Sequence, residues 1–347
     1  MKTYRVGILG ASGAVGREML KVLAERHFPI SELRPLSSKK SAGQKMDYEG
    51  KTYTFEEATH DSFRGLDLVL GAAANPVALA FKDDIVKAGA LFIDNSSAFR
   101  MEEDVPLVVP EINREDIFLN HGVIANPNCS TIITLMAIKG IARLSKIVSI
   151  NAATYQATSG AGIQGPLELF EEMDDLVSQY HQTQQIPTDC NQAKPQTFPY
   201  QIAGNVIPCI GNVLPNGYTK EEMKMQNEGR KILHLPNLFV TCTCVRVPVA
   251  RSHSIAVTVV TEDHLEVEAV KEAIRHEAGC RLYDDAENGI YPMPLLTSDQ
   301  DMVYVGRIRK DLINPEHGIS LFCCGDQIRK GAATNAVEIA QAYIQGK

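Results

Sequence analysis

Short apolar runs alternate with helical patterns over residues 1 to about 125. The runs expected to form strands lie at 5–9, 66–71, 91–94 and 123–125, and one further strand ends in the segment LRPLSSKKSAG. After the first run, apolar residues such as Met19 and Leu23 recur at helical spacing, which predicts a helix from about residue 13 to 26. Strands that alternate with amphipathic helices are typical of a parallel sheet covered by helices. We therefore predict a doubly wound α/β domain over residues 1–128.

The pattern changes after residue 128. Apolar residues from Ile132 to Ile138 predict a helix, and β-branched runs at 147–154, 238–249 and 253–260 predict strands of a second, mixed or antiparallel sheet. Residues 182–218 are rich in Pro, Gln and Asn but keep apolar residues throughout, so we expect a long ordered excursion rather than a linker. Helical spacing returns over 331–344. We predict an α+β domain over 129–328, with the C-terminal helix, about 329–347, packing back on the first domain.

Composition and charge narrow the class of protein. The chain has 347 residues, 44% of them hydrophobic, and a formal net charge of −8. It is long and apolar enough to bury a core, which argues against disorder. No run of Lys and Arg exceeds two residues and no apolar run approaches the length of a membrane span, so we expect no nucleic-acid or membrane partner. No secretion signal is visible, which predicts a cytoplasmic protein with free thiols at its eight cysteines.

Three glycines, Gly10, Gly13 and Gly16, follow the first predicted strand and open the first predicted helix. Glycines at this point permit a tight turn and the close approach of phosphate oxygens, while the helix presents its free N–H groups and positive dipole end. This context favours a Rossmann-type dinucleotide site over the alternative, an ordinary strand-to-helix turn.

The end of the second predicted strand indicates which dinucleotide is bound. An NAD site usually carries a carboxylate there, to bond the ribose 2′-hydroxyl. This chain instead has Ser37, Ser38, Lys39 and Lys40, whose hydroxyls and positive charges suit a 2′-phosphate. We therefore predict NADP, with a solvated basic turn as the alternative.

One cysteine stands at the start of a predicted helix. In the segment VIANPNCSTII, Pro127 ends a strand and Asn128 can cap a helix whose first turn contains Cys129. A helix N-terminus favours the thiolate, which is the nucleophilic form. A thiolate in a chain that binds a nicotinamide cofactor predicts an acylating aldehyde dehydrogenase, in which the cysteine carries a thioester. Cys242 and Cys244 lack the second ligand pair of a zinc site, so no metal is predicted.

The blocks GASGAVG, NPNCST, TYQATSGAG, RVPVARSHS and IRKGAATN occur in this order along the chain. Together they resemble the aspartate-semialdehyde dehydrogenase family, and the resemblance spans nearly the whole chain. It implies reductive dephosphorylation of L-aspartyl 4-phosphate by NADPH. This reaction is a step in the biosynthesis of lysine, threonine, methionine and diaminopimelate. It also implies a homodimer or a tetramer whose subunits contact one another through the second domain.

The resemblance assigns roles to individual residues. Cys129 matches the nucleophile, His253 the acid/base catalyst and Gln156 the residue that orients the substrate beside the thiol. Arg246 lies seven positions before His253 along what we expect to be the same strand region, and it matches the guanidinium that clamps the substrate carboxylate. The other substrate residues implied are Arg100 and Lys224 for phosphate, Glu221 for the amine, and Asn128. The cofactor residues implied are Gly10, Ser12, Gly13, Ala14, Val15, Ser37, Ser38, Lys39, Lys40, Ser159, Gly160 and Gln327.

Two departures from the family pattern stand out. AAANP (72–76) replaces a glycine-rich segment near the adenine, and Gln327 replaces an asparagine. Two alternatives also stay open. An N-acetyl-γ-glutamyl-phosphate reductase shares this logic, although Glu221 suits a free amine. A non-catalytic NADP-binding regulator is the other alternative, although it would not need Cys129.

Overall fold

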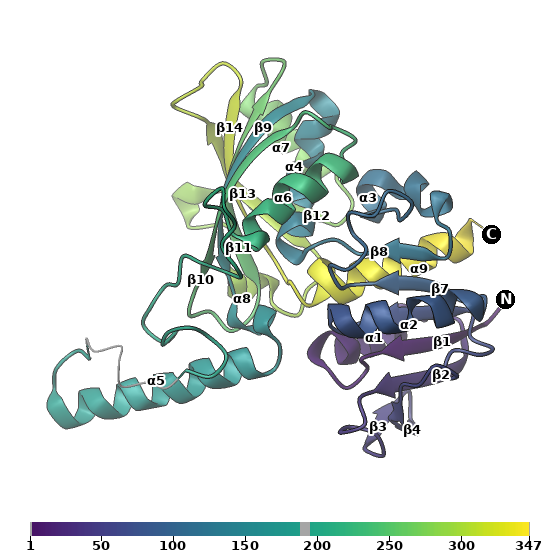
Figure 1. Cartoon of the computed structure of the whole chain (residues 1–347). Coiled ribbons are helices and arrows are strands. Elements are labelled where there is room, and N and C mark those ends of the chain that lie inside the picture. Colours follow the sequence, from purple (N-terminus) through teal and green to yellow (C-terminus); the bar gives the residue numbers. More distant parts are fainter. Residues whose placement is uncertain (1, 188–194, 347) are drawn as a thin grey trace. The chain divides into compact units, whose positions relative to one another are not determined.

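The computed structural model describes residues 2–187 and 195–346 (Figure 1). The chain forms two compact units. The first unit comprises Met1–Ile132, Asn227–Pro236 and Ile328–Lys347, and the second comprises Ile133–Gln226 and Asn237–Gln327. The sequence patterns do not anticipate that a short internal segment, Asn227–Pro236, belongs to the first unit.

The first unit contains a six-stranded sheet in the order β5-β2-β1-β6-β7-β8, and all of its neighbouring strands are parallel. The strand order reverses between β1 and β6, and the crevice outside the carboxyl ends of such strands is where doubly wound sheets bind ligands. The strands are β1 (Tyr4–Leu9), β2 (Ile30–Ser37), β5 (Glu56–Glu57), β6 (Leu68–Gly71), β7 (Leu91–Asp94) and β8 (Val123–Ala125).

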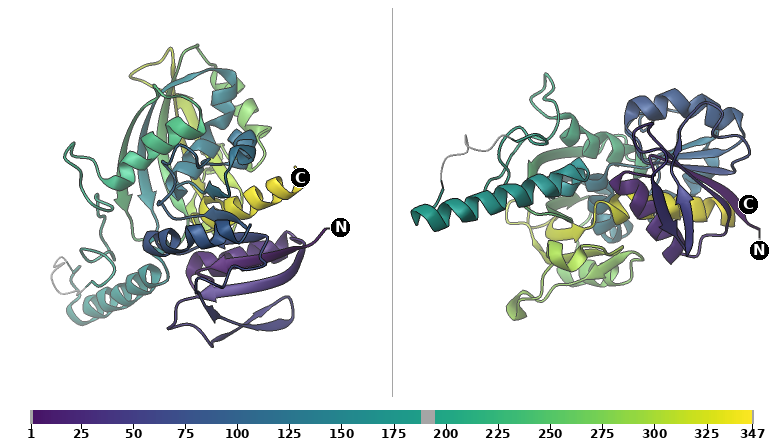
Figure 2. Two further views of the ribbon diagram at one scale, coloured as in Figure 1. Left: turned by 45° about the vertical axis from the view of Figure 1, so that its right-hand side comes forward. Right: turned by 90° about the horizontal axis from the view of Figure 1, so that it is seen from below.

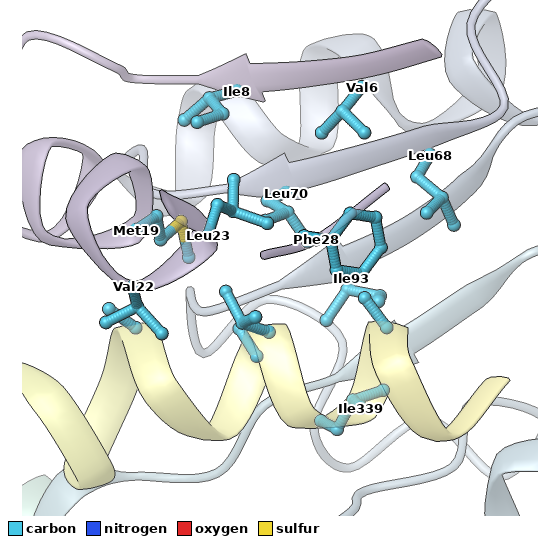
Figure 3. Close-up of a cluster of buried hydrophobic side chains, with 14 of the residues drawn as sticks. Val6, Ile8, Met19, Val22, Leu23, Phe28, Leu68, Leu70, Ile93 and Ile339 are labelled. Atoms are coloured by element: carbon cyan, nitrogen blue, oxygen red, sulfur yellow. The ribbon is translucent and has the colours of Figure 1, made fainter. Parts of the chain in front are cut away.

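The core of this unit lies between the sheet and the helices α1 (Ala14–Glu25) and α9 (Thr334–Gln345) (Figure 3). Alternation along the strands decides which side chains reach it. Ile93 on β7 belongs to this cluster together with Met19 of α1 and Ile339 of α9 (Figure 3), whereas the neighbouring Phe92 packs against Phe99. The C-terminal helix therefore contributes to the core of the first unit.

A buried ionic network holds the π-helical turn Arg329–Ala333, which leads into α9. Arg329 donates to Glu18 of α1 at 3.1 Å, and Lys330, only 1% exposed, donates to Glu111 and Glu338 at 2.6 Å each. A buried ammonium is tolerated when its donors are satisfied by carboxylates. These bonds account for the charged residues of the IRKGAATN block within the first unit.

The remaining elements of the first unit are short apart from α2. The hairpin β3–β4 turns at Glu49 and Gly50. Both residues have positive φ, as a two-residue turn of type I′ requires. The elements are α2 (Asn75–Lys87), β3 (Lys45–Tyr48), β4 (Lys51–Thr54), α3 (Pro110–Asn113) and the 3₁₀ helix Arg114–Leu119.

The second unit is built on a mixed six-stranded sheet in the order β10-β9-β11-β14-β13-β12. Two of its strand pairs, β10–β9 and β12–β13, are parallel, and the others are antiparallel. This confirms the predicted mixed sheet. The strands are β9 (Ile147–Gln156), β10 (Phe239–Arg246), β11 (His253–Thr261), β12 (Cys280–Leu282), β13 (Val303–Lys310) and β14 (Gly318–Gly325).

The longest helix, α5 (Gln164–Thr183), extends away from this sheet (Figure 2). Part of the predicted excursion packs on it, since Phe198 and Ile202 form a buried cluster with Leu169. Residues 188–194 of the excursion, Cys190 among them, lie outside the described residues. The other helices are α7 (Val267–Arg275), α8 (Pro294–Thr297) and the 3₁₀ helices Thr158–Ala161 and Ala286–Asn288, while α4 (Cys129–Leu144) and α6 (Lys220–Ile232) continue from one unit into the other.

Among the described helices, none combines the length and the hydropathy needed to cross a bilayer.

Candidate active site

The glycine loop after β1 has no room for side chains at two of its glycines. Gly10 has a φ of +90°, and a Cβ there would come within 2.8 Å of the Ala72 carbonyl. A Cβ on Gly16 would come within 2.3 Å of the Gly10 oxygen. Gly13 is the N-cap of α1 and supplies no side-chain cap. The loop therefore presents bare backbone at a helix N-terminus, and this geometry fits the pyrophosphate of a dinucleotide.

The predicted cofactor residues of this loop, Ser12 to Val15, are half-buried. At the end of β2, Ser37 is buried and its hydroxyl donates to the Ser38 carbonyl at 3.2 Å, so it stabilises the turn. Ser38, Lys39 and Lys40 are exposed, and neither lysine forms an ion pair with another described residue. Their positive charges therefore stand uncompensated at the position where a 2′-phosphate is expected.

Cys129 begins α4 and is partly exposed. Asn128 caps the helix, because its Oδ1 accepts the N–H groups of Ser130 at 3.0 Å and Thr131 at 3.3 Å. The cap satisfies two of the free N–H groups at the helix N-terminus, but the helix dipole remains. The thiol therefore lies where a negative charge is favoured. Asn128 itself is buried, so its capping role is structural; its contact with substrate stays a prediction.

Arg100 is buried in the loop after β7 and is held by two partners. Its Nη1 donates to Glu228 at 3.0 Å and its Nη2 donates to the Asn95 carbonyl at 2.7 Å. Near it, burial raises the pKa of Asp94 to about 6, although the Ser96 hydroxyl and the charge of Arg100 act in the opposite direction. The sequence gives no indication of Glu228, because it lies 128 residues from Arg100 along the chain.

Five predicted residues come together in the second unit. The parallel register pairs Gln156 at the end of β9 with Arg246 at the end of β10, and β11 begins at His253 on the other side of β9. Gln156 donates to Glu221 at 3.2 Å, and Lys224 donates to the same carboxylate at 2.8 Å. Two cations, a carboxylate, an amide and an imidazole thus lie together at one end of these strands.

The expectation that Arg246 and His253 share one strand region is wrong. Arg246 ends β10 and His253 begins β11, and β9 lies between these strands in the sheet. The intervening segment contains Pro248, which lacks the N–H that a continuing strand needs. The two side chains are nevertheless close neighbours, because a Cβ built on Gly160 would lie 2.9 Å from Arg246 and 3.3 Å from His253.

His253 is completely buried, and its ring is oriented by the backbone. The Ala157 N–H donates to Nδ1 at 3.0 Å, so proton exchange by this ring takes place at Nε2, which lies 3.5 Å from the Gln156 side-chain nitrogen. Burial and, secondarily, the positive charge of Arg246 lower the pKa of His253 to about 3, while Glu221 acts in the opposite direction. The imidazole is therefore neutral at neutral pH.

Gln327, the residue that departs from the family pattern, is bonded at both ends of its amide. It donates to the Ser159 hydroxyl and accepts the Ser252 N–H at 2.9 Å. Ser252 precedes His253 and has a φ of +77°, a conformation that costs a serine about 1–3 kcal/mol. The Ser252 hydroxyl also bonds Thr297 at 2.5 Å. Ser252 and Thr297 thus help to place His253, and no sequence pattern indicates them.

The described residues contain no group of three or more His, Cys, Asp or Glu side chains arranged to hold a metal ion. Cys242 and Cys244 are buried with their sulfurs 3.7 Å apart and no disulfide between them. The hydrogen bond with Cys244 and, secondarily, burial raise the pKa of the Cys242 thiol, which is buried whereas Cys129 is partly exposed.

Comparisons with known proteins cover the same two parts of the chain. Residues 5–119 match the family described as semialdehyde dehydrogenase, NAD binding domain, and residues 138–330 match semialdehyde dehydrogenase, dimerisation domain. The chain is 45% identical to an aspartate-semialdehyde dehydrogenase of Campylobacter jejuni subsp. jejuni, over 100% of this chain and 99% of the relative. It is 43% identical to the aspartate-semialdehyde dehydrogenase of Aquifex aeolicus, over 99% of this chain and 98% of the relative.

Solved structures agree with these matches. The structure of aspartate semialdehyde dehydrogenase II from Vibrio cholerae, complexed with ASA, has a TM-score of 0.93 and 40% identity, with 99% of each chain covered. Fold, glycine loop and family matches together define an oxidoreductase that acts on an aldehyde or acyl phosphate and binds a nicotinamide dinucleotide. Within this class, the chain belongs to the aspartate-semialdehyde dehydrogenase family, which confirms the resemblance and the fold class predicted from the sequence.

Proposed function

We propose that this protein is an NADP-dependent aspartate-semialdehyde dehydrogenase that reduces L-aspartyl 4-phosphate to L-aspartate 4-semialdehyde in lysine, threonine and methionine biosynthesis. The observation that carries the proposal is that Gln156 brings a carboxylate and a guanidinium together, since it donates to Glu221 at 3.2 Å and is paired in register with Arg246 on the neighbouring strand. An α-amino acid carries an ammonium and a carboxylate on one carbon, and a carboxylate beside a guanidinium matches that charge pattern. Full-length relatives with 43–45% identity support the same substrate.

In the proposed mechanism, the Cys129 thiolate attacks the acyl carbon, a C–S bond forms and the C–O bond to phosphate breaks. Arg100 and Lys224 bind the departing phosphate. NADPH, when bound, supplies the hydride that reduces the thioester. Nε2 of His253 donates to the substrate oxygen that becomes negative, and when that oxygen re-forms its carbonyl the C–S bond breaks and Cys129 leaves as a thiolate.

The other predicted residues orient these groups. Gln156 holds the substrate beside the thiol, Arg246 clamps its α-carboxylate, and Glu221 accepts its ammonium. Ser159, Gly160 and Gln327 contribute to the nicotinamide side of the cofactor site, and the backbone from Gly10 to Val15 holds the pyrophosphate. We also propose that the reaction takes place in the cytoplasm, where reducing conditions keep Cys129 as a thiol.

An assay of the reverse reaction tests this function. Purified protein with aspartate semialdehyde, phosphate and NADP is expected to produce NADPH, followed by its absorbance. The N-acetylated glutamate semialdehyde serves as the competing substrate, because it lacks the ammonium that Glu221 would bind. A larger kcat/KM on the acetylated substrate would decide for the reductase, and no turnover with either would favour a non-catalytic regulator.

The choice of NADP over NAD is proposed to depend on Lys39 and Lys40. Replacing both with alanine removes two charged contacts to the 2′-phosphate, so kcat/KM for NADP is expected to fall about 10- to 100-fold while that for NAD stays unchanged. The double variant of Lys45 and Lys51 on the β3–β4 hairpin is the matched control, with both cofactors unaffected. Equal efficiency of the wild-type protein with NADP and NAD would contradict the proposal.

We further propose that the protein is a homodimer whose contact includes an apolar stripe on α5. Leu167, Phe170, Met173 and Val177 recur along one side of this helix and are 43–55% exposed, and the stripe lies in the region that matches a dimerisation domain. Phe170→Glu is expected to shift the sedimentation coefficient to that of a monomer. Gln182→Glu adds the same charge elsewhere on the helix and should leave the dimer intact. A wild-type monomer would refute the dimer, and a dimeric Phe170→Glu variant would refute this contact.

A further inference from the structure

We propose that Glu228 is a positioning residue that holds the phosphate-binding cation Arg100 and the peptide before the nucleophile Cys129 in one arrangement. The inference rests on the proposed function for its catalytic meaning. Glu228 lies on α6 in Asn227–Pro236, the segment that belongs to the first unit, and it is 1% exposed. A carboxylate buried this deeply must have its charge and its lone pairs satisfied.

Each oxygen of Glu228 has a different partner. Oε1 accepts from Nη1 of Arg100 at 3.0 Å, and Oε2 accepts the backbone N–H of Asn128 at 2.7 Å. The Asn128 side chain meanwhile caps α4, so Cys129 stands between a peptide fixed by Glu228 and a helix turn fixed by the cap. One carboxylate thereby connects the cation to the backbone that carries the nucleophile.

The same segment also fixes the loop of Arg100. Lys231, one turn after Glu228, donates to the carbonyl oxygens of Arg100, Glu102 and Val105 at 3.0, 2.6 and 2.7 Å. With Nη2 bonded to Asn95, the guanidinium has little rotational freedom. Its Nε is buried and has no hydrogen-bond partner among the described residues. That remaining N–H suits an anionic oxygen of the substrate phosphate.

The arrangement has an electrostatic consequence for the thiol. A carboxylate near Cys129 disfavours the thiolate, and Arg100 offsets that charge only while the two stay paired. Neutralising Glu228 should leave Arg100 uncompensated, which favours the thiolate. It should also weaken the charge-assisted bond that helps to fix the guanidinium, which weakens phosphate binding and catalysis. The two effects have opposite signs, so a purely structural role would not produce both.

The test compares Glu228→Gln, which keeps the shape and removes the charge, with Glu228→Asp, which keeps the charge. Two readouts are needed. The first is the pH profile of Cys129 alkylation by iodoacetamide, measured without substrate. For Glu228→Gln its midpoint should move about one pH unit lower, whereas for Glu228→Asp it should stay in place.

The second readout is steady-state kinetics of the reverse reaction with phosphate. For Glu228→Gln, kcat should fall about 10- to 100-fold and the KM for phosphate should rise, because misplacing a reacting group has effects of this size. The matched control is Glu222→Gln on the same helix. Glu222 is buried and accepts the N–H groups of Thr219 and Cys244, so this variant should lower the melting temperature without moving the alkylation profile.

Three results would overturn the inference. They are an unchanged alkylation profile in Glu228→Gln, wild-type kinetics in that variant, and loss of folding in both Glu228 variants, which would assign Glu228 to stability alone. The alkylation readout needs no substrate. If the wild-type protein does not turn over aspartate semialdehyde, the proposed function fails while the effect of Glu228 on the thiol is still measured.

Discussion

Cys129→Ser is expected to abolish phosphate-dependent formation of NADPH from aspartate semialdehyde. A serine hydroxyl is hardly ionised at neutral pH and is a far weaker nucleophile than a thiolate, so no covalent acyl intermediate accumulates. We expect kcat/KM to fall by roughly 10⁴-fold or more, the range seen when a nucleophile is removed. Mass spectrometry of protein mixed with substrate should show an acyl adduct on Cys129 in the wild type and none in the variant.

The matched control for this experiment is Cys209→Ser. Cys209 is an exposed free thiol of the second unit, and its sulfur is 3.7 Å from the Gly211 carbonyl. It has no part in the proposed mechanism, so the variant should keep wild-type activity. If Cys129→Ser kept more than a tenth of the activity, the thioester mechanism would be wrong whatever the control shows.

His253→Gln should lower kcat by about 10²- to 10⁴-fold, the usual contribution of a positioned acid/base group. Glutamine occupies similar space and keeps an N–H donor, but it cannot exchange a proton at the position of Nε2. Substrate binding should change little, because Arg246 and Glu221 remain. His264→Gln is the control, since His264 is exposed and pairs with Glu266. A fall in kcat of less than threefold would remove His253 from the mechanism.

The low pKa of His253 predicts that the stability of the folded protein depends on pH. The pKa of His253 in the folded protein, about 3, lies below the ordinary histidine pKa of 6.5, so acidification protonates this histidine in the unfolded chain before it does so in the folded one. Stability from this group is complete above pH 6.5 and is lost as the pH falls from 6.5 toward 3. Between pH 7 and 5 the loss is about 2 kcal/mol. Urea unfolding should show that His253→Gln loses less stability over this interval than the wild type does.

Several features of the site follow from short stretches of sequence, because short-range sterics and hydrogen bonds determine them. Gly10 and Gly16 are required by contacts within one strand-to-helix turn and with the adjacent strand end. Cys129 begins a helix, and Asn128 caps this helix by accepting the N–H groups of Ser130 and Thr131. The charge of Lys39 and Lys40 also needs no tertiary contact to be recognised. Such features can be predicted from spacing alone.

Other features depend on residues that are far apart in sequence. Glu228 bonds Asn128 across 100 residues, and Gln327 bonds Ser159 across 168. The strand order places β9 between the strands that carry Arg246 and His253, which corrects the expectation of a shared strand. No periodicity along the chain encodes such pairings, since they depend on which strands become neighbours.

The amino-acid sequence alone determined the alternating strands and helices of the first unit, the glycine loop, the cysteine at the start of its capped helix and the family. Each of the structural features depends on residues that lie close together in sequence, and the family is indicated by several such short blocks in a fixed order along the chain. Only the tertiary structure decided that Glu228 holds Arg100, that a strained Ser252 places His253, and that burial keeps this imidazole neutral. The physical reason is that burial, charge pairing and backbone strain arise from neighbours in space, and these are fixed only when the sheets assemble.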